Sequence, residues 1–263
     1  MSSPYTELSA TQRRAFGLSA VATILVVWAV LTTFSLVSPA KLPSIPQVAE
    51  AFMRLCWDAE RGESLLATAT AYSVMRVAAA GVLVVIIGLP IGILMGASPR
   101  INAFLSPLID PFRSAPVVAL LPILVMWLGI GELMKVCFLF VGAVVFLIPM
   151  VRDAMLAVNQ SHWIAARDLG ATSWEAVWLA VVPMAKPRIA DAITTSVSVM
   201  WTYITVAEYV NARKGLGQLI QNARRFSAMD QVFVGIFVII ALALVTYSSM
   251  VAIKQRLFPW ESE

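Results

Sequence analysis

The chain has 263 residues, of which 60% are hydrophobic and only 13% charged, and its mean hydropathy is +0.83. Soluble domains contain roughly 45 to 50% apolar residues, so the composition indicates a polytopic membrane protein. Two cysteines and one histidine exclude a disulfide framework and a histidine-rich metal site. The net charge of +4 fits basic residues that flank membrane spans and meet lipid headgroups. Binding to nucleic acid is therefore excluded.

Six apolar segments recur from end to end of the chain and leave no room for a separate soluble domain. Each is long enough to cross the hydrocarbon core, which takes about 20 helical residues. The predicted spans are residues 16–37, 67–97, 103–128, 132–157, 188–210 and 231–253. We therefore expect one all-α membrane domain, residues 1–263, with both termini on the same side.

The polar start of the chain leads into a first span that is too long for the apolar core of a signal peptide. After this span, Pro39, Pro43 and Pro46 are expected to prevent a helix. A partly polar helix is expected around residues 48–59, where it would lie on the outer membrane surface.

The second and third spans contain glycines and prolines at regular positions. Gly88, Gly92 and Gly96 form a doubled G-x-x-x-G pattern, which predicts a flat helix face for close packing. Pro90 lies between two of these glycines and is a candidate kink. The third span is interrupted repeatedly and is expected to be irregular, because broken helices in membranes are tolerated where they are buried in protein or line a cavity. Its prolines are Pro107, Pro111, Pro116 and Pro122.

The segment 161–187 lies between two apolar spans but is too polar to be buried in lipid. Ser161 is expected to cap a short helix that ends at Gly170, where a residue without a Cβ can take a left-handed turn. Thr172 and Glu175 have the spacing of a capping box, so a second helix should begin there and end at Pro183. The first helix carries small side chains, which predicts a docking surface on it.

The positive-inside rule gives the orientation by a small margin. The basic residues divide into two groups, one on each side of the membrane. Several residues of one group lie farther from the span ends and are mixed with acidic residues, so the other group is assigned to the cytoplasm. Both termini and the segment 161–187 are then cytoplasmic. The inner group is Arg13, Arg14, Arg100, Arg152, Arg167, Lys186, Arg188, Lys254 and Arg256, and the outer group is Lys41, Arg54, Arg61, Arg213, Lys214, Arg224 and Arg225.

Ionisable residues inside predicted spans are candidates for function, since a charge at the bilayer centre costs at least about 2.5 to 3.5 kcal/mol. Arg76 and Asp191 lie near span ends and can equally serve as structural pairs. Arg113 lies deeper, in the broken third span. Glu208 follows Trp201 and Tyr203, whose rings can line a cavity wall. Alternatively, Arg113 and Glu208 can pair with each other for stability alone.

No G-x-x-x-x-G-K-[ST] phosphate-binding loop occurs in the sequence. No nucleophile has a plausible base, because His162, the single histidine, lies among polar residues at the expected start of a helix and fits a solvated side chain better than a catalytic one. We therefore expect no enzymatic activity and no cofactor in this chain.

The segment 161–187 resembles the EAA loop of ABC-importer permeases, E-A-A-x-x-x-G followed after nine residues by I-x-L-P. Ile164, Ala165, Ala166 and Gly170 match its first part, with isoleucine where glutamate is usual. Ala180, Val182 and Pro183 match its second part. The resemblance implies a coupling helix that docks on an ATPase. The coupling residues that it implies are Ser161, Ile164, Ala165, Ala166, Arg167, Asp168, Gly170, Ala171 and Pro183.

Nearly the whole chain resembles the nitrate/sulfonate/taurine subgroup of these permeases, through LPSIPQV, RSAPVVALLPILVMWLGIGELMK, AEYVNARKGLGQLI and FPW. The resemblance implies a type I permease fold in a bacterial inner membrane, a second permease copy, two ATPase subunits that hold ATP and Mg²⁺, and an extracytoplasmic solute-binding protein. Alternating access would then import a small solute, such as taurine, another organic sulfonate or nitrate. The candidate path residues are Arg76, Arg113, Trp201, Tyr203 and Glu208.

A stand-alone secondary transporter or channel is the alternative, because six spans with polar residues inside them would also suit such a protein. The segment 161–187 distinguishes the two classes, since a protein that works alone has no reason to keep a docking loop.

Overall fold

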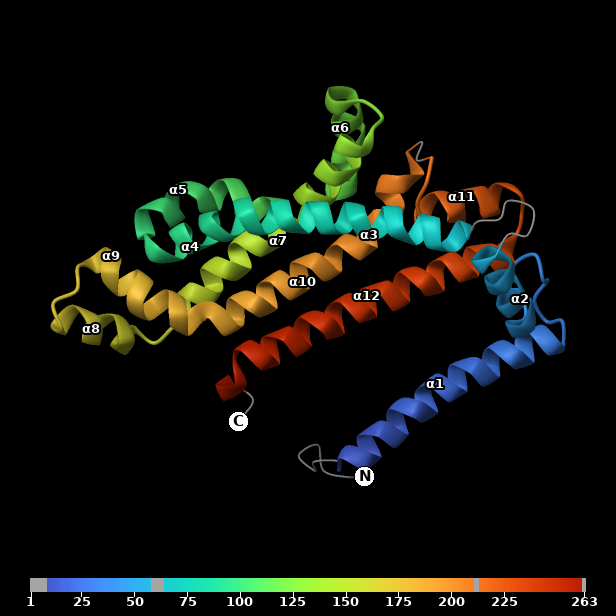
Figure 1. Cartoon of the computed structure of the whole chain (residues 1–263), viewed down its shortest axis with the longest axis horizontal. Helices are drawn as coiled ribbons and strands as arrows, with labels where there is room; N and C mark the ends of the chain where they lie inside the picture. Colours follow the sequence, from blue (N-terminus) through green and yellow to red (C-terminus); the bar gives the residue numbers. More distant parts are fainter. Residues whose placement is uncertain (1–8, 58–63, 211–212, 262–263) are drawn as a thin grey trace. The chain divides into compact units, whose positions relative to one another are not determined.

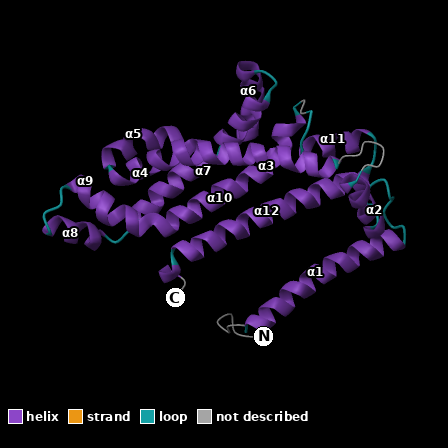
Figure 2. Cartoon of the chain, in the orientation of Figure 1, coloured by secondary structure: helices purple, strands orange, loops and turns teal. Residues whose placement is uncertain are grey.

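The computed structural model describes residues 9–57, 64–210 and 213–261, and in these ranges it contains helices and turns but no β-strand (Figures 1 and 2). The prediction of an all-α polytopic membrane protein is confirmed. The end of the helix expected at 48–59, and Arg61, lie outside the described residues, as do the side chains of Arg13 and Arg14. The chain divides into two compact units, Met1–Leu65 with Ile220–Gly235 and Leu66–Leu219 with Ile236–Glu263.

In the first unit, two capped helices follow each other. A capping box of Ser9 and Gln12 starts α1 (Ala10–Thr33), and a second box begins α2 (Ile45–Cys56) at Ser44. Pro46 lies in the first turn of α2, where its missing N–H costs no intrahelical hydrogen bond. The prediction that Pro46 prevents a helix is therefore wrong, and α2 begins at Ile45.

Three side-chain contacts hold the first unit together. Trp28 Nε1 donates a hydrogen bond of 2.9 Å to the Pro43 carbonyl oxygen, and the Trp28 ring lies 5.7 Å from that of Phe233. Arg54 and Asp230 form a salt bridge of 2.8 Å. The first unit thus joins α1 and α2 to the first turns of α12 (Met229–Leu257).

In the second unit, α4 (Leu89–Ala97) packs along α7 (Glu132–Leu156), which packs along α10 (Val182–Tyr209). α3 (Leu65–Leu83) and a π-helical turn, η1 (Val84–Gly88), lead into α4. The unit also contains the short helices α8 (Gln160–Asp168) and α9 (Ser173–Ala176) and the first part of α11 (Leu216–Arg225). Large side chains from the long helices form its core: Val84, Met95, Phe138, Leu147, Met200 and Ile204.

The predicted third span is broken, as its prolines indicate. It consists of α5 (Pro99–Ile109), the 3₁₀ turns η2 (Asp110–Arg113) and η3 (Val117–Leu120), and α6 (Leu121–Leu128). Its two arms meet at an angle of 97°. Figure 1 shows α6 directed away from α5 at this break. The bend places Arg113 at the corner between the arms.

Among the described residues, four helices are long and apolar enough to cross a membrane, and five if the bent pair counts as one span. The four are Ala15–Thr33, Leu65–Ala97, Glu132–Leu156 and Met229–Leu257. The remaining predicted span, 188–210, lies within α10, which is helical throughout. α10 is long enough to span, but Asp191, Glu208 and several hydroxyl side chains make it more polar than the other helices.

The glycine face of α4 packs directly against α7, which confirms the close-packing prediction. A Cβ added at Gly92 would lie 2.6 Å from Val151 Cβ and 2.9 Å from the Ile148 carbonyl oxygen. One added at Gly88 would lie 3.0 Å from Val144 Cγ2. The two backbones therefore approach as closely as glycine allows.

Gly92→Val is expected to destabilise the permease by about 1 to 3 kcal/mol, because the added side chain overpacks the α4–α7 contact. Thermal unfolding of the purified protein in detergent measures the loss. Gly17→Val is the matched control, since Gly17 has no atom within 4 Å of its added Cβ and lies on the exposed α1. Equal melting temperatures for the two variants would contradict the packing argument.

Two prolines within long helices each follow a π-helical turn. η1 precedes Pro90, and η4 (Val177–Val181) precedes Pro183. A proline ring clashes with the carbonyl of residue i−4, and a π turn interrupts the i−4 bonding pattern at that point. The helix from Ser173 therefore continues through Pro183 to Tyr209, and the prediction that Pro183 ends it is wrong.

Candidate functional site: a coupling segment and a buried ion network

The segment after α7 begins with the short helix α8. Asn159 is its N-cap, and the Asn159 side chain accepts a hydrogen bond of 2.9 Å from the Ser161 N–H. The prediction that Ser161 caps this helix is wrong by two residues. Gly170 has φ +94°, as expected for the left-handed residue that closes a helix. Its N–H donates to the Arg167 carbonyl oxygen at 3.0 Å.

The turn between α8 and α9 is held by side chains from both helices. Arg167 Nη1 donates a 2.7 Å hydrogen bond to the Ala171 carbonyl oxygen. The predicted capping box is confirmed: the Thr172 N–H donates to Glu175 Oε2 at 2.7 Å, and the Glu175 N–H donates to Thr172 Oγ1 at 3.3 Å. Hydrogen bonding to Thr172 keeps the pKa of Glu175 below its ordinary value, so Glu175 is ionised at neutral pH.

The surface of this segment combines polar side chains with exposed apolar ones. No residue of α8 is buried, and Ile164, Ala165 and Asp168 are exposed, while Ala166 is half-buried. Leu169 is 90% exposed at the tip. The sequence reasoning missed Leu169, although an aliphatic residue directly before the left-handed glycine was a visible signal. Exposed apolar groups gathered on one segment indicate a protein contact.

The segment is joined firmly to two long helices. α7 ends at Leu156, shortly before α8, and α9 continues through η4 into α10 without a break. Arg188 Nη1 donates to the Ala157 carbonyl oxygen at 3.4 Å. Figure 1 shows α8 and α9 at one end of the α7–α10 pair. The α8–α9 segment is therefore attached to a long helix at each of its ends.

A network of buried charges lies where α3, α7 and α10 meet. Arg76, 2% exposed, donates from Nη1 to Glu208 Oε1 at 2.6 Å. Its Nε and Nη2 reach the two oxygens of Glu132 at 2.6 and 2.8 Å. Lys135 donates to Glu132 Oε1 at 2.9 Å. The positive charges of Arg76 and Lys135 balance the negative charges of Glu132 and Glu208. This balance offsets the desolvation cost of burying Arg76, Lys135 and Glu208.

The same network holds the loop that follows α10. Arg76 Nη1 donates to the Lys214 carbonyl oxygen at 2.8 Å, and the Gly217 N–H donates to Glu208 Oε2 at 2.7 Å. Ser73 Oγ accepts from the Leu216 N–H at 2.9 Å and donates to Glu208 Oε1 at 2.8 Å. Every hydrogen-bonding atom of the Glu208 carboxylate thus has a partner, and the loop is tied to α3 and α10.

Gly215 is required where this loop passes the network. Its φ is +132°, and an added Cβ would lie 2.5 Å from Glu208 Cδ and 2.6 Å from Arg76 Nη1. A residue with a Cβ would be strained at this φ, and its Cβ would clash with Glu208 and Arg76, so only glycine fits at this position.

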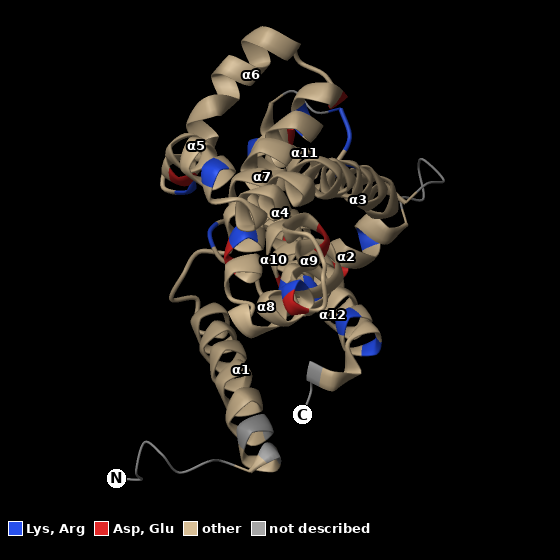
Figure 3. Cartoon of the chain, turned by 90° about the vertical axis from the view of Figure 1, so that its left-hand side faces the viewer, with Lys and Arg blue, Asp and Glu red and all other residues tan. Residues whose placement is uncertain are grey.

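The five candidate path residues do not form one site. Arg76 and Glu208 pair, which bears out the structural-pair alternative for Arg76. Asp191 likewise pairs with Lys254 at 2.7 Å. The alternative pairing of Arg113 with Glu208 is wrong: Arg113 is exposed in η2 and makes no ion pair within the described ranges. Figure 3 shows most Lys, Arg, Asp and Glu residues, coloured on the ribbon, near helix ends and in turns.

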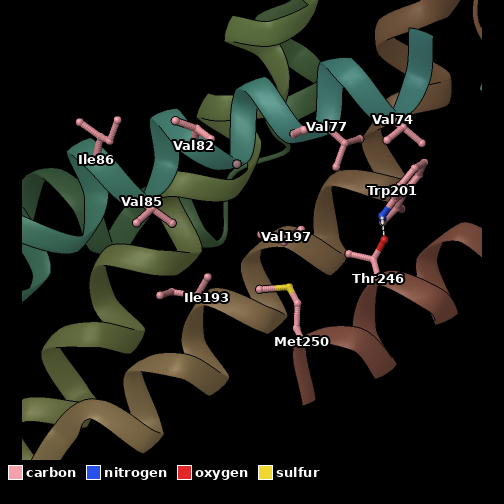
Figure 4. A pocket seen from close by; sticks show the side chains of 12 residues that line it. Val74, Val77, Val82, Val85, Ile86, Ile193, Val197, Trp201, Thr246 and Met250 are labelled. Carbon is pink, nitrogen blue, oxygen red and sulfur yellow. Dashed lines mark hydrogen bonds between the residues drawn. The ribbon is translucent and has the colours of Figure 1, made fainter. Parts of the chain in front are cut away.

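Trp201 and Tyr203 point to different surroundings. Trp201 Nε1 donates to Thr246 Oγ1 at 3.2 Å, and its ring lines an apolar cavity of about 440 Å³ between α3, α10 and α12 (Figure 4). Tyr203 packs edge-on against Phe138, with ring centres 6.0 Å apart. Trp201 therefore faces a cavity with no group to bind a charged solute, and Tyr203 fills the contact between α7 and α10.

Broken and continuous membrane helices, with an exposed segment attached to two of them, fit the membrane subunit of a transporter. Residues 88–259 match the family described as "Binding-protein-dependent transport system inner membrane component". The chain belongs to this family of ABC-importer permeases. The segment 161–187 lies inside the matched residues. An importer permease is thereby supported over a stand-alone secondary transporter or channel.

Named relatives agree with this membership. The chain is 32% identical to the taurine transport system permease protein TauC of Escherichia coli (strain K12), over 92% of this chain and 88% of that protein. It is 28% identical to the putative aliphatic sulfonates transport permease protein SsuC of Bacillus subtilis (strain 168), over 94% and 87%. A chain of the inward-facing MetNI methionine ABC transporter has the same fold, with a TM-score of 0.64 and 24% identity, over 73% of this chain and 95% of that one.

Proposed function

We propose that this permease imports an organic sulfonate, such as taurine, by alternating access. The support for this substrate class is the similarity to taurine and aliphatic sulfonate permeases along almost the whole chain. Arg113 is the path residue that suits an anion, since it is exposed at the break of a membrane helix and carries no ion pair within the described ranges. Arg76 has a structural role in this proposal.

The observation that carries the proposed mechanism is the exposed coupling segment joined to α7 and α10. In the proposal, a groove on an ATPase grips α8 and the tip at Leu169 and Gly170, and ATPase closure moves both helices together. Two permease copies pair, and two ATPase subunits hold ATP and Mg²⁺. An extracytoplasmic solute-binding protein delivers the substrate. Both termini and α8 face the cytoplasm.

Uptake of radiolabelled taurine tests the function. The permease, its ATPase and its binding protein are expressed together in a bacterium that lacks its own sulfonate importers. We expect uptake that needs all three components and that falls when unlabelled alkanesulfonates compete. Competition by nitrate but not by alkanesulfonates would contradict the sulfonate assignment. Uptake that persists when the ATPase is omitted would contradict the importer mechanism.

A further inference from the structure

The cavity between α3, α10 and α12 is an apolar groove. Its walls are aliphatic apart from Trp201 and Thr246, which bond to each other at 3.2 Å. Apart from the Thr246 hydroxyl, the lining has no polar group to hold water or a polar solute, and apolar cavities stay dry. Figure 4 shows aliphatic side chains of α3 and α10 and Met250 of α12 directed into it. Its occupant must be hydrocarbon.

The groove continues toward the C-terminal end of α12. A second recess of about 180 Å³ shares Ile193 and Met250 with the first and ends at Lys254 and Leu257. Thr246 to Leu257 spans about 17 Å at the α-helical rise of 1.5 Å per residue. This length is close to one leaflet of a hydrocarbon core about 30 Å thick. The groove is thus as long as a single acyl chain in one leaflet.

The end of the groove has the composition of a membrane–water interface. Lys254 is paired with Asp191 at 2.7 Å, so their charges cancel. Arg256 is exposed one residue before the end of α12 and has no ion-pair partner in the part of the chain that the structure describes. Phe258 and Trp260 follow, with ring centres 5.5 Å apart, and aromatic side chains collect at this depth of a bilayer. Of the charged side chains that the structure describes at this end of α12, Lys254 is neutralised by Asp191, and Arg256 is left with a positive charge.

We propose that this groove binds one acyl chain of an anionic phospholipid, with the headgroup against Arg256 and Lys254. Walls without polar groups select hydrocarbon, and the excess positive charge at one end selects an anionic headgroup over a zwitterionic one. The proposal concerns lipid binding and does not depend on the transported substrate.

The test uses full-length permease, delipidated in detergent and then given equal amounts of phosphatidylglycerol and phosphatidylcholine. Lipid retained after gel filtration is quantified by mass spectrometry. We expect the protein to retain mainly phosphatidylglycerol. Ala78→Phe, which fills the groove, should lower retention by at least about tenfold, because each methylene displaced adds to the loss. Ala79→Phe is the matched control, since Ala79 is exposed on the same helix but does not line the groove.

Arg256→Gln tests the headgroup contact. It should lower the preference for phosphatidylglycerol about fivefold, the effect of one basic residue near a charged surface, while Arg100→Gln at the start of α5 leaves the preference unchanged. Equal retention of the two lipids by the unaltered protein would overturn the headgroup assignment. Equal loss in Ala78→Phe and Ala79→Phe, or no loss in either, would overturn the groove assignment.

Fluorescence gives an independent measurement of the acyl chain. Phosphatidylglycerol with brominated acyl chains should quench the unaltered protein more than Trp201→Phe, because Trp201 lines the groove. Quenching of the same size in both proteins would mean that no acyl chain lies beside Trp201. A protein helix in the groove would give that result together with no bound lipid.

Discussion

Arg76→Met is expected to prevent accumulation of folded permease, or to destabilise it by about 3 to 5 kcal/mol. Removing one partner of a buried ion pair leaves an uncompensated charge, and Glu208 has 0% exposure. The substitution also removes the hydrogen bond to the Lys214 carbonyl oxygen. Immunoblots of membranes and thermal unfolding in detergent measure the effect.

Two further variants separate charge balance from loss of contacts. Arg76→Met/Glu208→Leu removes one cation and one carboxylate, so it should recover much of the accumulation that Arg76→Met loses. Glu132→Gln should cost less than Arg76→Met, because the Glu132 side chain is 56% exposed. Recovery of accumulation without recovery of uptake would show that Arg76 also contributes to transport. Wild-type melting of Arg76→Met would refute the structural role.

Gly170→Asp is expected to lower uptake by at least about tenfold while the permease remains inserted, a loss that corresponds to about 1.4 kcal/mol of coupling free energy. No atom lies within 4 Å of a Cβ at Gly170, so the added side chain meets no neighbour, and the strain that it adds comes from the backbone φ of +94°. A bulky charge at the tip blocks close approach of the ATPase. Uptake and co-purification of the ATPase with the permease measure the result.

Gly170→Asn is the matched control, because asparagine has the size of aspartate without its charge and tolerates left-handed backbone better than most residues. Its uptake should lie between those of the wild type and Gly170→Asp. Leu169→Ser removes an exposed apolar contact with no backbone strain, and it should weaken ATPase co-purification. The docking proposal is refuted if Gly170→Asp keeps both uptake and ATPase co-purification unchanged.

Features that depend on local spacing could be predicted from the sequence. The capping box at Thr172 and Glu175, the left-handed Gly170 and the glycine face of α4 are all fixed by residues within a turn or two of each other. Helix boundaries were less certain: Asn159 rather than Ser161 caps α8, since several polar residues near a helix start can serve as the cap.

The buried network could not be predicted, because its members are distant in sequence. Arg76 bonds to Glu132, 56 residues away, and to Glu208, 132 residues away. Glu132 was not a candidate, because it stands at the start of a span, where a charge is unremarkable. The continuation of the helix through Pro183 was also missed, since only the three-dimensional path reveals a π turn.

The π turn at Val177–Val181 sets the angle at which α9 meets α10. A π turn amounts to one extra residue in an α-helix, and each helical residue turns the chain by about 100°. Deleting one residue there would rotate α9 about the axis of α10 by that amount. The direction in which α9, and with it the turn to α8, projects from α10 is therefore set by a single residue of helix register.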